Sequence, residues 1–277
     1  MEEYISDNSL YIRSKNNSMI NRKMIGRVLG MLLFIELGMF LLCAGVSAGY
    51  GESDYKYFLY TCIINAVVGG LLLLYGRGAE NKMSRRDGYC VVTLSWVFFT
   101  FFGMLPFYFS GSIDTITNAF FETMSGFTTT GATILDDIES LSHGMLFWRS
   151  LTQWIGGLGI VFFTIAILPI FTTGGVQLFS AESTGVTHDR THPKINVMAK
   201  WLWTIYLVLT VSETVLLMFG GMSLFDAICQ SFATTATGGY STKQNSISYW
   251  NSPYIEYVVA IFMICLLYTS PSPRDPK

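Results

Sequence analysis

The stretch GFTTTGAT, from Gly126 to Thr133, places three threonines and two glycines between a short apolar run and an acidic patch. It is compatible with a surface turn, with a loop that cradles phosphate, or with unwound backbone whose carbonyl oxygens bind a ligand. The segments on either side decide between these, because they determine whether this backbone lies in water or at membrane depth.

The composition of the chain is typical of a membrane protein. Of its 277 residues 51% are hydrophobic, and only 13% are charged, against roughly 25% in soluble domains. With a net charge of −2 the sequence holds no Lys/Arg stripe that would neutralise phosphates, so the charge pattern gives no basis for expecting nucleic acid as a partner. The five cysteines lack CxxC spacing, so we interpret them as small buried apolar residues.

Six apolar runs are candidates for transmembrane helices, because a bilayer core of about 30 Å needs about 20 helical residues. The polar N-terminus lacks the features of a secretory signal, so we expect the first run to be retained. The runs cover approximately Met24 to Ala48, Tyr57 to Tyr75, Tyr89 to Ser110, Met145 to Phe171, Val197 to Phe219 and, shorter than the others, Tyr254 to Tyr268.

Two further apolar segments, Asp114 to Phe127 and Leu224 to Ala233, are too short to cross a bilayer and have the length of re-entrant helices. Asp114 is the expected N-cap of the first. Ser223, with Asp226 three residues later, forms the expected capping box of the second.

Each short segment ends in threonine and glycine. Thr128 to Gly131 reads TTTG and Thr235 to Gly238 reads TATG, so three of four positions match when the glycines are aligned. The chain therefore repeats a unit of helix, short re-entrant helix, Thr/Gly loop and helix. Both units run in the same direction, which argues against an inverted repeat.

The distribution of Lys and Arg predicts the orientation. With a cytoplasmic N-terminus, most of the 17 basic residues fall on the cytoplasmic side: Arg13, Lys15, Arg22, Lys23, Arg27, Arg77, Lys82, Arg85, Arg86, Arg190, Lys194 and Lys200. Both Thr/Gly loops then face outward, at the ends of short helices that dip in from the outer side.

At membrane depth, irregular backbone is tolerated only where it is buried in protein or lines a watery cavity. Carbonyl oxygens there, together with the negative end of the short helix, favour a cation. Gly131 and Gly238 permit backbone angles that other residues resist. A phosphate loop is disfavoured, because Gly131 is followed by Ala132 where a Walker motif has lysine.

These residues resemble a known family. The motif RDG at Arg86 to Gly88, the stretch FETMSGFTTTGAT that ends at Thr133, and Arg149 with Gln153 and Trp154 ahead of three glycines look like the membrane subunit of Trk-type potassium uptake systems. SFATTATGGYST, from Ser231 to Thr242, resembles that family's second pore loop.

The resemblance implies an all-α integral membrane protein in which four helix–pore loop–helix units surround one ion path, preceded by two extra helices. Only two units are present here. The implied organisation is a cytoplasmic segment (1–23), two leading helices (24–80), a first unit (85–171), a cytoplasmic linker (172–196), a truncated second unit (197–268) and an anomalous proline-rich tail (269–277).

The resemblance also implies a selectivity filter made of backbone carbonyls. Its residues are Thr128, Thr129, Thr130 and Gly131 in the first unit and Thr235, Ala236, Thr237 and Gly238 in the second. We expect five residues to support the filter from behind: Glu122, Arg149, Gln153, Gly156 and Gly157.

Alternatives remain for these supports. Arg149 and Trp154 fit an interfacial belt equally well. Glu122 either hydrogen-bonds backbone behind the loop or contacts the ion, and Cys229 is its expected counterpart in the second unit.

We expect potassium uptake across a bacterial inner membrane, with K⁺ as the transported ion, no cofactor and no enzymatic activity. His188 and His192 have the spacing of a metal pair, but they lie in a cytoplasmic loop, so no resident metal is assigned. The resemblance implies a cytoplasmic nucleotide-binding regulatory subunit and a homodimer of the full-length protein. Alternatives are a Na⁺- or H⁺-coupled secondary transporter and a non-transporting fragment.

Overall fold

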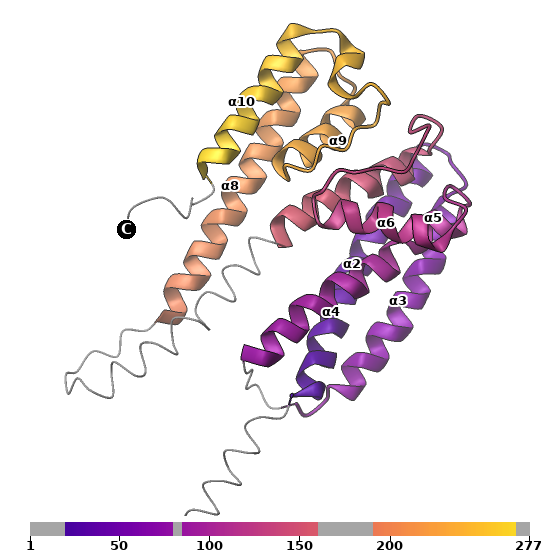
Figure 1. Ribbon diagram of the computed structural model, residues 1–277, viewed down its shortest axis with the longest axis vertical. Helices are drawn as coiled ribbons and strands as arrows, with labels where there is room; N and C mark the ends of the chain where they lie inside the picture. The colour runs from indigo at the N-terminus through magenta and orange to yellow at the C-terminus, as the bar shows by residue number, and fades with distance from the viewer. Residues whose placement is uncertain (1–19, 80–84, 160–190, 270–277) are drawn as a thin grey trace, which may run out of the picture.

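The structure, a computed structural model, describes residues 20–79, 85–159 and 191–269, and all regular structure within these ranges is helical (Figure 1). The described part thus confirms the expected all-α class.

Helices α2 (Arg22–Gly49) and α3 (Tyr55–Tyr75) form an antiparallel hairpin. The side chain of Asn21 caps α2 by accepting a hydrogen bond from Met24 N at 3.2 Å. The two helices approach closely at glycines, since a Cβ added at Gly30 would lie 2.9 Å from the carbonyl oxygen of Gly69. This close contact fixes how α2 and α3 pack.

The third apolar run is broken into α4 (Arg85–Gly103) and α5 (Leu105–Phe109). The predicted apolar run from Tyr89 to Ser110 nevertheless corresponds to a single membrane-length span, Arg86–Phe109, interrupted only at Met104. The break follows from Pro106, which donates no backbone hydrogen bond and whose ring would clash with the carbonyl group four residues earlier.

The first short helix is α6 (Ile116–Phe127), which lies across the upper ends of α2 and α4 in Figure 1. With 12 residues it is about 18 Å long, roughly half the thickness of a bilayer core. Its N-cap is Thr115, which accepts from Asn118 N at 3.2 Å, so the predicted cap Asp114 is wrong by one residue. Thr115 has the extended backbone that an N-cap requires.

The second unit consists of α8 (Thr191–Phe219), α9 (Leu224–Thr235), the 3-10 helix η1 (Ser246–Trp250) and α10 (Pro253–Thr269). The capping box of α9 is confirmed: Ser223 Oγ accepts from Asp226 N at 3.1 Å and donates to Asp226 Oδ2 at 2.8 Å. Helices α8 and α10 lie side by side in Figure 1 and share an apolar core with α9.

A helix over residues 143–159, which follows the first Thr/Gly loop, contacts elements of both units. Its Trp148 is fully buried and donates from Nε1 to the carbonyl oxygen of Gly103 at 2.9 Å. Trp154 and Phe147 contact Phe232 of α9, with ring centroids 5.1 and 5.8 Å apart. This helix therefore packs against α4 of the first unit and α9 of the second, and so holds the two units together.

Two polar contacts show which helix ends share a side of the molecule. Asn21 N donates to Asp87 Oδ1 at 2.9 Å, joining the starts of α2 and α4. At the opposite ends, Glu52 in the α2–α3 turn accepts from His143 N at 2.8 Å and from Gly144 N at 3.2 Å. The helices thus alternate in direction as the predicted spans require.

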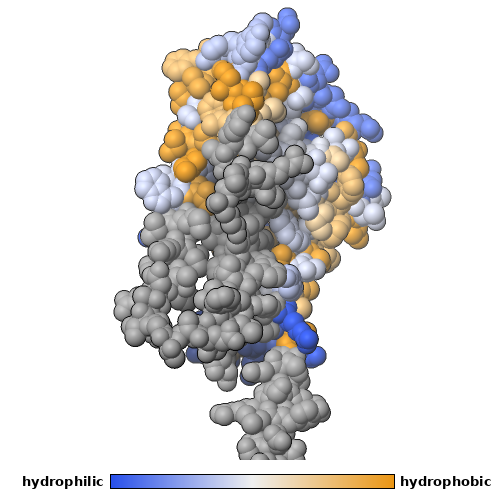
Figure 2. All heavy atoms as spheres, turned by 60° about the vertical axis from the view of Figure 1, so that its left-hand side comes forward, coloured by the Kyte–Doolittle hydropathy of each residue, from blue (hydrophilic) through white to orange (hydrophobic). Residues whose placement is uncertain are grey.

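Four helices of the described part are long and apolar enough to cross a membrane: Arg22–Gly49, Tyr55–Tyr75, Arg86–Phe109 and Lys200–Phe219. The predicted fourth run is described only to residue 159, and the sixth is a shorter apolar helix, Pro253–Leu266. Large apolar side chains remain exposed on these helices, including Leu42, Leu71, Trp201 and Ile261, and Figure 2 shows apolar residues over wide areas of the surface. The chain is a multi-pass membrane protein.

The α2–α3 contact predicts opposite effects of two alanine substitutions on one helix. Gly30→Ala pushes a methyl group into the Gly69 carbonyl and should lower the thermal midpoint in detergent, whereas Gly38→Ala meets open space and should leave it unchanged or raise it. A thermal melt of both variants checks this. Equal effects would show that the helices do not approach at Gly30.

The Glu52 contact predicts a pH dependence of stability. Burial favours the neutral carboxyl, but the His143 and Gly144 donors outweigh it, so the pKa of Glu52 is lowered. The stabilisation is complete above the unfolded-state pKa and is lost as pH falls through the lowered folded-state pKa. The difference in thermal midpoint between wild type and Glu52→Gln should shrink in that acid range. Glu256→Gln, which removes an exposed carboxylate, is the matched control.

Candidate ion-binding site

The two short helices end in the same backbone motif. After α6, Thr129 N donates to Gly126 O at 3.0 Å and Thr130 N to Ser125 O at 2.9 Å. After α9, Thr237 N donates to Thr234 O and Gly238 N to Ala233 O, both at 2.8 Å. This is the Schellman pattern of helix C-termini.

In both loops a threonine occupies the left-handed position of this motif. Thr129 has φ 54° and Thr237 has φ 55°, an unusual conformation for a β-branched residue. Strain of this kind costs of order 1–3 kcal/mol and persists only where the surroundings enforce it. Its occurrence in both units singles out these two loops.

The shared motif sets the correspondence between the units. Thr129 matches Thr237 and Gly131 (φ 75°) matches Gly239 (φ 84°), while Gly238 takes the place of Thr130. Aligning Gly131 with Gly238, as the sequence suggested, is therefore off by one residue. With the same alignment of the two units, the residue equivalent to Glu122 in the second unit is Gln230, not Cys229.

The two Thr/Gly stretches meet each other. A Cβ added at Gly131 would collide with the carbonyl oxygen of Gly238, so the first loop passes directly beside the second. The C-terminal ends of α6 and α9 thus converge on one region. Each end carries a partial negative charge from the helix dipole.

The backbone around this region has an excess of acceptors. The N–H groups of Thr128, Thr129 and Thr130 all donate to carbonyls of α6. In the part of the chain that the structure describes, the carbonyl oxygens of residues 128–131 and 236–239 accept no hydrogen bond. Of the described N–H groups in these two stretches, only those of Gly131 and Gly239 donate to no acceptor, so free carbonyl oxygens outnumber free donors. Such a site suits a cation and disfavours an anion.

Behind the first loop lies a buried ion pair. Arg149 Nε donates to Glu122 Oε1 at 2.7 Å, and the two side chains are 2% and 0% exposed. Glu122 also accepts from Thr133 Oγ1 at 2.9 Å and from Ile134 N at 3.0 Å, just after the Thr/Gly stretch. The carboxylate therefore holds the segment that follows the Thr/Gly stretch. Of the two roles expected for Glu122, this arrangement fits hydrogen bonding behind the loop.

Arg149 also reaches the second unit. Its Nη1 donates to Ser241 O at 3.0 Å, and its guanidinium lies 3.7 Å from the ring centre of Tyr240. Tyr240 in turn donates its hydroxyl to Glu122 O at 2.8 Å. One buried network thus connects the segment after the first Thr/Gly stretch to the segment after the second.

Gln153 and two glycines support the loops from the same helix. Gln153 Oε1 accepts from Tyr240 N at 3.1 Å, and its amide fills the space where Gly238 has no side chain. Gly156 abuts the carbonyl oxygen of Phe127, and a Cβ at Gly157 would lie 3.0 Å from Ala236 Cα. Trp154 donates to Thr210 Oγ1 at 3.1 Å and is packed among aromatic rings.

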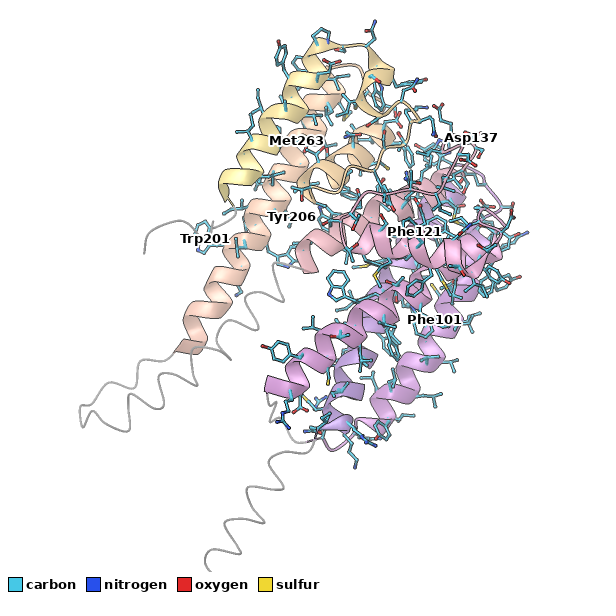
Figure 3. The ribbon with its side chains drawn as sticks, viewed as in Figure 1. Phe101, Phe121, Asp137, Trp201, Tyr206 and Met263 are labelled. Carbon is cyan, nitrogen blue, oxygen red and sulfur yellow. The ribbon has the colours of Figure 1, made fainter. Side chains whose placement is uncertain are left out.

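The free carbonyl region is open on one side. Thr128, Thr130, Thr237 and Gly239 are exposed, whereas Ala236 and Gly238 are buried. Asp137, labelled in Figure 3, lies in the loop that follows the first stretch and is exposed like Asp136. Among the described residues no cluster of His, Cys, Asp and Glu is suited to hold a metal ion, and His188 lies outside those residues.

Sequence reasoning missed Tyr240, Ser241 and Gly239. Their roles depend on contact between the units, which no local pattern reveals. The pair of adjacent glycines at Gly238 and Gly239 was the one available signal, because it leaves open which glycine takes the left-handed position.

Comparison with known proteins identifies relatives. Residues 55–265 match the family model TrkH, described as a cation transport protein. The Trk system potassium uptake protein TrkH of Escherichia coli K12 is 42% identical over 242 residues, which cover 87% of this chain and 50% of that protein. TrkG of the same organism is 31% identical over 244 residues, 87% of this chain and 50% of that protein.

The crystal structure of the potassium transporter TrkH from Vibrio parahaemolyticus superposes with a TM-score of 0.77 at 34% identity, covering 89% of this chain and 50% of that one. The chain spans about half the length of these relatives.

The buried pair predicts a strong asymmetry between single and double substitutions. Arg149→Leu leaves the Glu122 charge buried without its partner and should destabilise the fold by about 3–5 kcal/mol. Replacing both residues by apolar ones should restore much of that loss. Lys243→Ala, which removes the surface pair with Glu139 at 3.5 Å, is the control and should cost less than about 1 kcal/mol. Chemical denaturation in detergent measures all three, and equal losses for Arg149→Leu and Lys243→Ala would contradict the buried pair.

Proposed function

Because the chain belongs to the TrkH family of cation transport proteins, we propose that it forms about half of a pore for potassium uptake. The backbone carbonyls of its two Thr/Gly loops would bind K⁺ in that pore. The relatives are named as potassium uptake proteins of a Trk system.

The observation that carries this proposal is the set of free carbonyl oxygens at residues 128–131 and 236–239, where the C-terminal ends of two half-length helices converge. Carbonyl oxygens can replace the hydration shell of a potassium ion. Helix C-termini add negative potential at the same place.

The filter residues follow from this geometry. Thr128, Thr129, Thr130 and Gly131 form the first quarter. In the second quarter the sequence pattern favours Thr235 to Gly238, but the shared helix-end motif supports the frame from Ala236 to Gly239. Glu122, Arg149, Gln153, Gly156 and Gly157 are supports that hold the loops and do not contact the ion.

A site with four sides needs two more quarters, which we propose are supplied by the part of the full-length protein that this chain does not span. Residues 24–80 then form the leading hairpin, 85–171 the first unit and 197–268 the second, with 172–196 as the linker between them. The exposed side of the loops supports this arrangement, because two further units would cover it.

We propose that the N-terminus is cytoplasmic in a bacterial inner membrane and that the loops face outward. Arg22, Arg77 and Arg86 all lie near helix ends on the side joined by the contact between Asn21 and Asp87. The positive-inside rule assigns that side to the cytoplasm. A cytoplasmic nucleotide-binding subunit and a homodimer of the full-length protein remain proposals from the family resemblance alone.

The test is Rb⁺ uptake by a potassium-uptake-deficient host that expresses the full-length protein containing this chain. Gly131→Ser should reduce uptake or its selectivity over Na⁺ at least tenfold, because a Cβ there meets the Gly238 carbonyl. Gly239→Ser, at the matching φ of 84°, should act in the same direction.

The control is Gly111→Ser, which has a similar φ of 71° but open space around its Cα and lies outside the filter. Unchanged selectivity in Gly131→Ser would refute the filter. A steep dependence of uptake on a Na⁺ or proton gradient, beyond the effect on membrane voltage, would favour coupled transport.

A further inference from the structure

A second polar site lies inside the helix bundle, away from the Thr/Gly loops. Glu36 on α2 and Asn65 on α3 are both completely buried. Asn65 Nδ2 donates to Glu36 Oε2 at 3.2 Å. The mechanism of ion binding described above uses neither residue.

This pair leaves two oxygens without partners. Glu36 Oε1 and Asn65 Oδ1 are buried and make no hydrogen bond. Both are acceptors when the carboxyl is ionised, so neither can satisfy the other. A single proton on Glu36 changes this, because the acid O–H can donate to the amide oxygen while the acid carbonyl accepts from the amide NH₂.

The walls around Glu36 supply no compensating charge. A Cβ added at Gly103 of α4 would lie 3.2 Å from Glu36 Oε1, 3.0 Å from Thr123 Cγ2 and 2.9 Å from a Phe127 ring atom. These neighbours are backbone, a methyl group and an aromatic ring. They offer no cation.

The ionisable groups on the surrounding elements are engaged elsewhere or are thiols. Glu122 on α6 and Arg149 of the 143–159 helix pair with each other at 2.7 Å. Cys62 on α3 directs its thiol to Leu37 O at 3.8 Å, and Cys43 on α2 is buried. Within the described ranges no basic side chain forms an ion pair with Glu36. A buried carboxylate without a partner is far more costly than a neutral acid.

We infer that Glu36 is a proton-binding site, held as a neutral carboxylic acid in a two-hydrogen-bond pair with Asn65 between α2 and α3. The inference rests on the burial, the contact and the two unpartnered oxygens, and it does not depend on the proposed function.

The position of this pair gives it a structural role in the first unit. Thr123 and Phe127 are on the last turns of α6, immediately before the Thr128 to Gly131 stretch, and both lie against Gly103 beside Glu36. The acid–amide pair therefore joins α2 to α3 near the place where Gly103 of α4 meets Thr123 and Phe127 of α6. Glu36 thus lies close to the last turns of α6, with Gly103 of α4 between them.

Infrared difference spectroscopy of the full-length protein in detergent tests the proton directly. Wild type should show the carbonyl band of protonated carboxylic acid at neutral pH, shifted in D₂O, and Glu36→Gln should lose part of its intensity, the remainder belonging to other buried carboxyls such as Glu213. Glu256→Gln, which removes an exposed carboxylate of α10, should retain the band. If Glu36→Gln instead removes ionised-carboxylate bands, or bands that change when K⁺ replaces Na⁺, the inference is overturned.

Thermal melts provide a second readout. Glutamine can make the same two hydrogen bonds to Asn65 as a neutral acid, so Glu36→Gln should keep the thermal midpoint within about 2 °C of wild type. Asn65→Leu leaves the acid without a partner and should lower it by about 3–8 °C. A loss in Glu36→Gln as large as that in Asn65→Leu would contradict a protonated Glu36.

Discussion

Backbone that is not helical cannot leave its polar groups unpaired in a bilayer unless it lines a polar space, and this constraint governs the two Thr/Gly loops. In these loops most N–H groups are paired, but the carbonyl groups are not. The first three N–H groups after each of α6 and α9 are paired with helix carbonyls, while the carbonyls of residues 128–131 and 236–239 remain free. The chain thereby presents oxygen atoms, with few competing donors, where two helix C-termini converge.

Such an arrangement needs rigid support, because free carbonyls repel one another. Arg149 supplies much of it, through an ion pair with Glu122 of the first unit and a hydrogen bond to Ser241 O of the second. Gln153, Gly156 and Gly157 bring the same helix against both loops. The buried Glu36–Asn65 contact joins α2 to α3 within the leading hairpin. The two units are therefore packed together behind the free carbonyl oxygens of the two loops.

The sequence predicted the parts of this structure that depend on local chemistry. Segment lengths distinguish spans from short helices, and Ser223 with Asp226 marks the start of α9. It failed where the answer depends on geometry between elements. Aligning the glycines made Gly131 equivalent to Gly238. The helix ends make it equivalent to Gly239, because the left-handed residue that ends each helix is a threonine, Thr129 in one unit and Thr237 in the other. The link from Arg149 to Tyr240 joins segments 91 residues apart in numbering, and no repeat or spacing points to it.

The central claim is that the free carbonyls of the two loops bind the transported ion. Anomalous X-ray diffraction from crystals of the full-length protein grown in Rb⁺ tests it most directly. The account predicts an Rb⁺ peak in contact with carbonyl oxygens of residues 128–131 and 236–239, which weakens in the Gly131→Ser variant. An Rb⁺ peak elsewhere in the membrane region, with these carbonyls hydrogen-bonded to other parts of the protein, would contradict it.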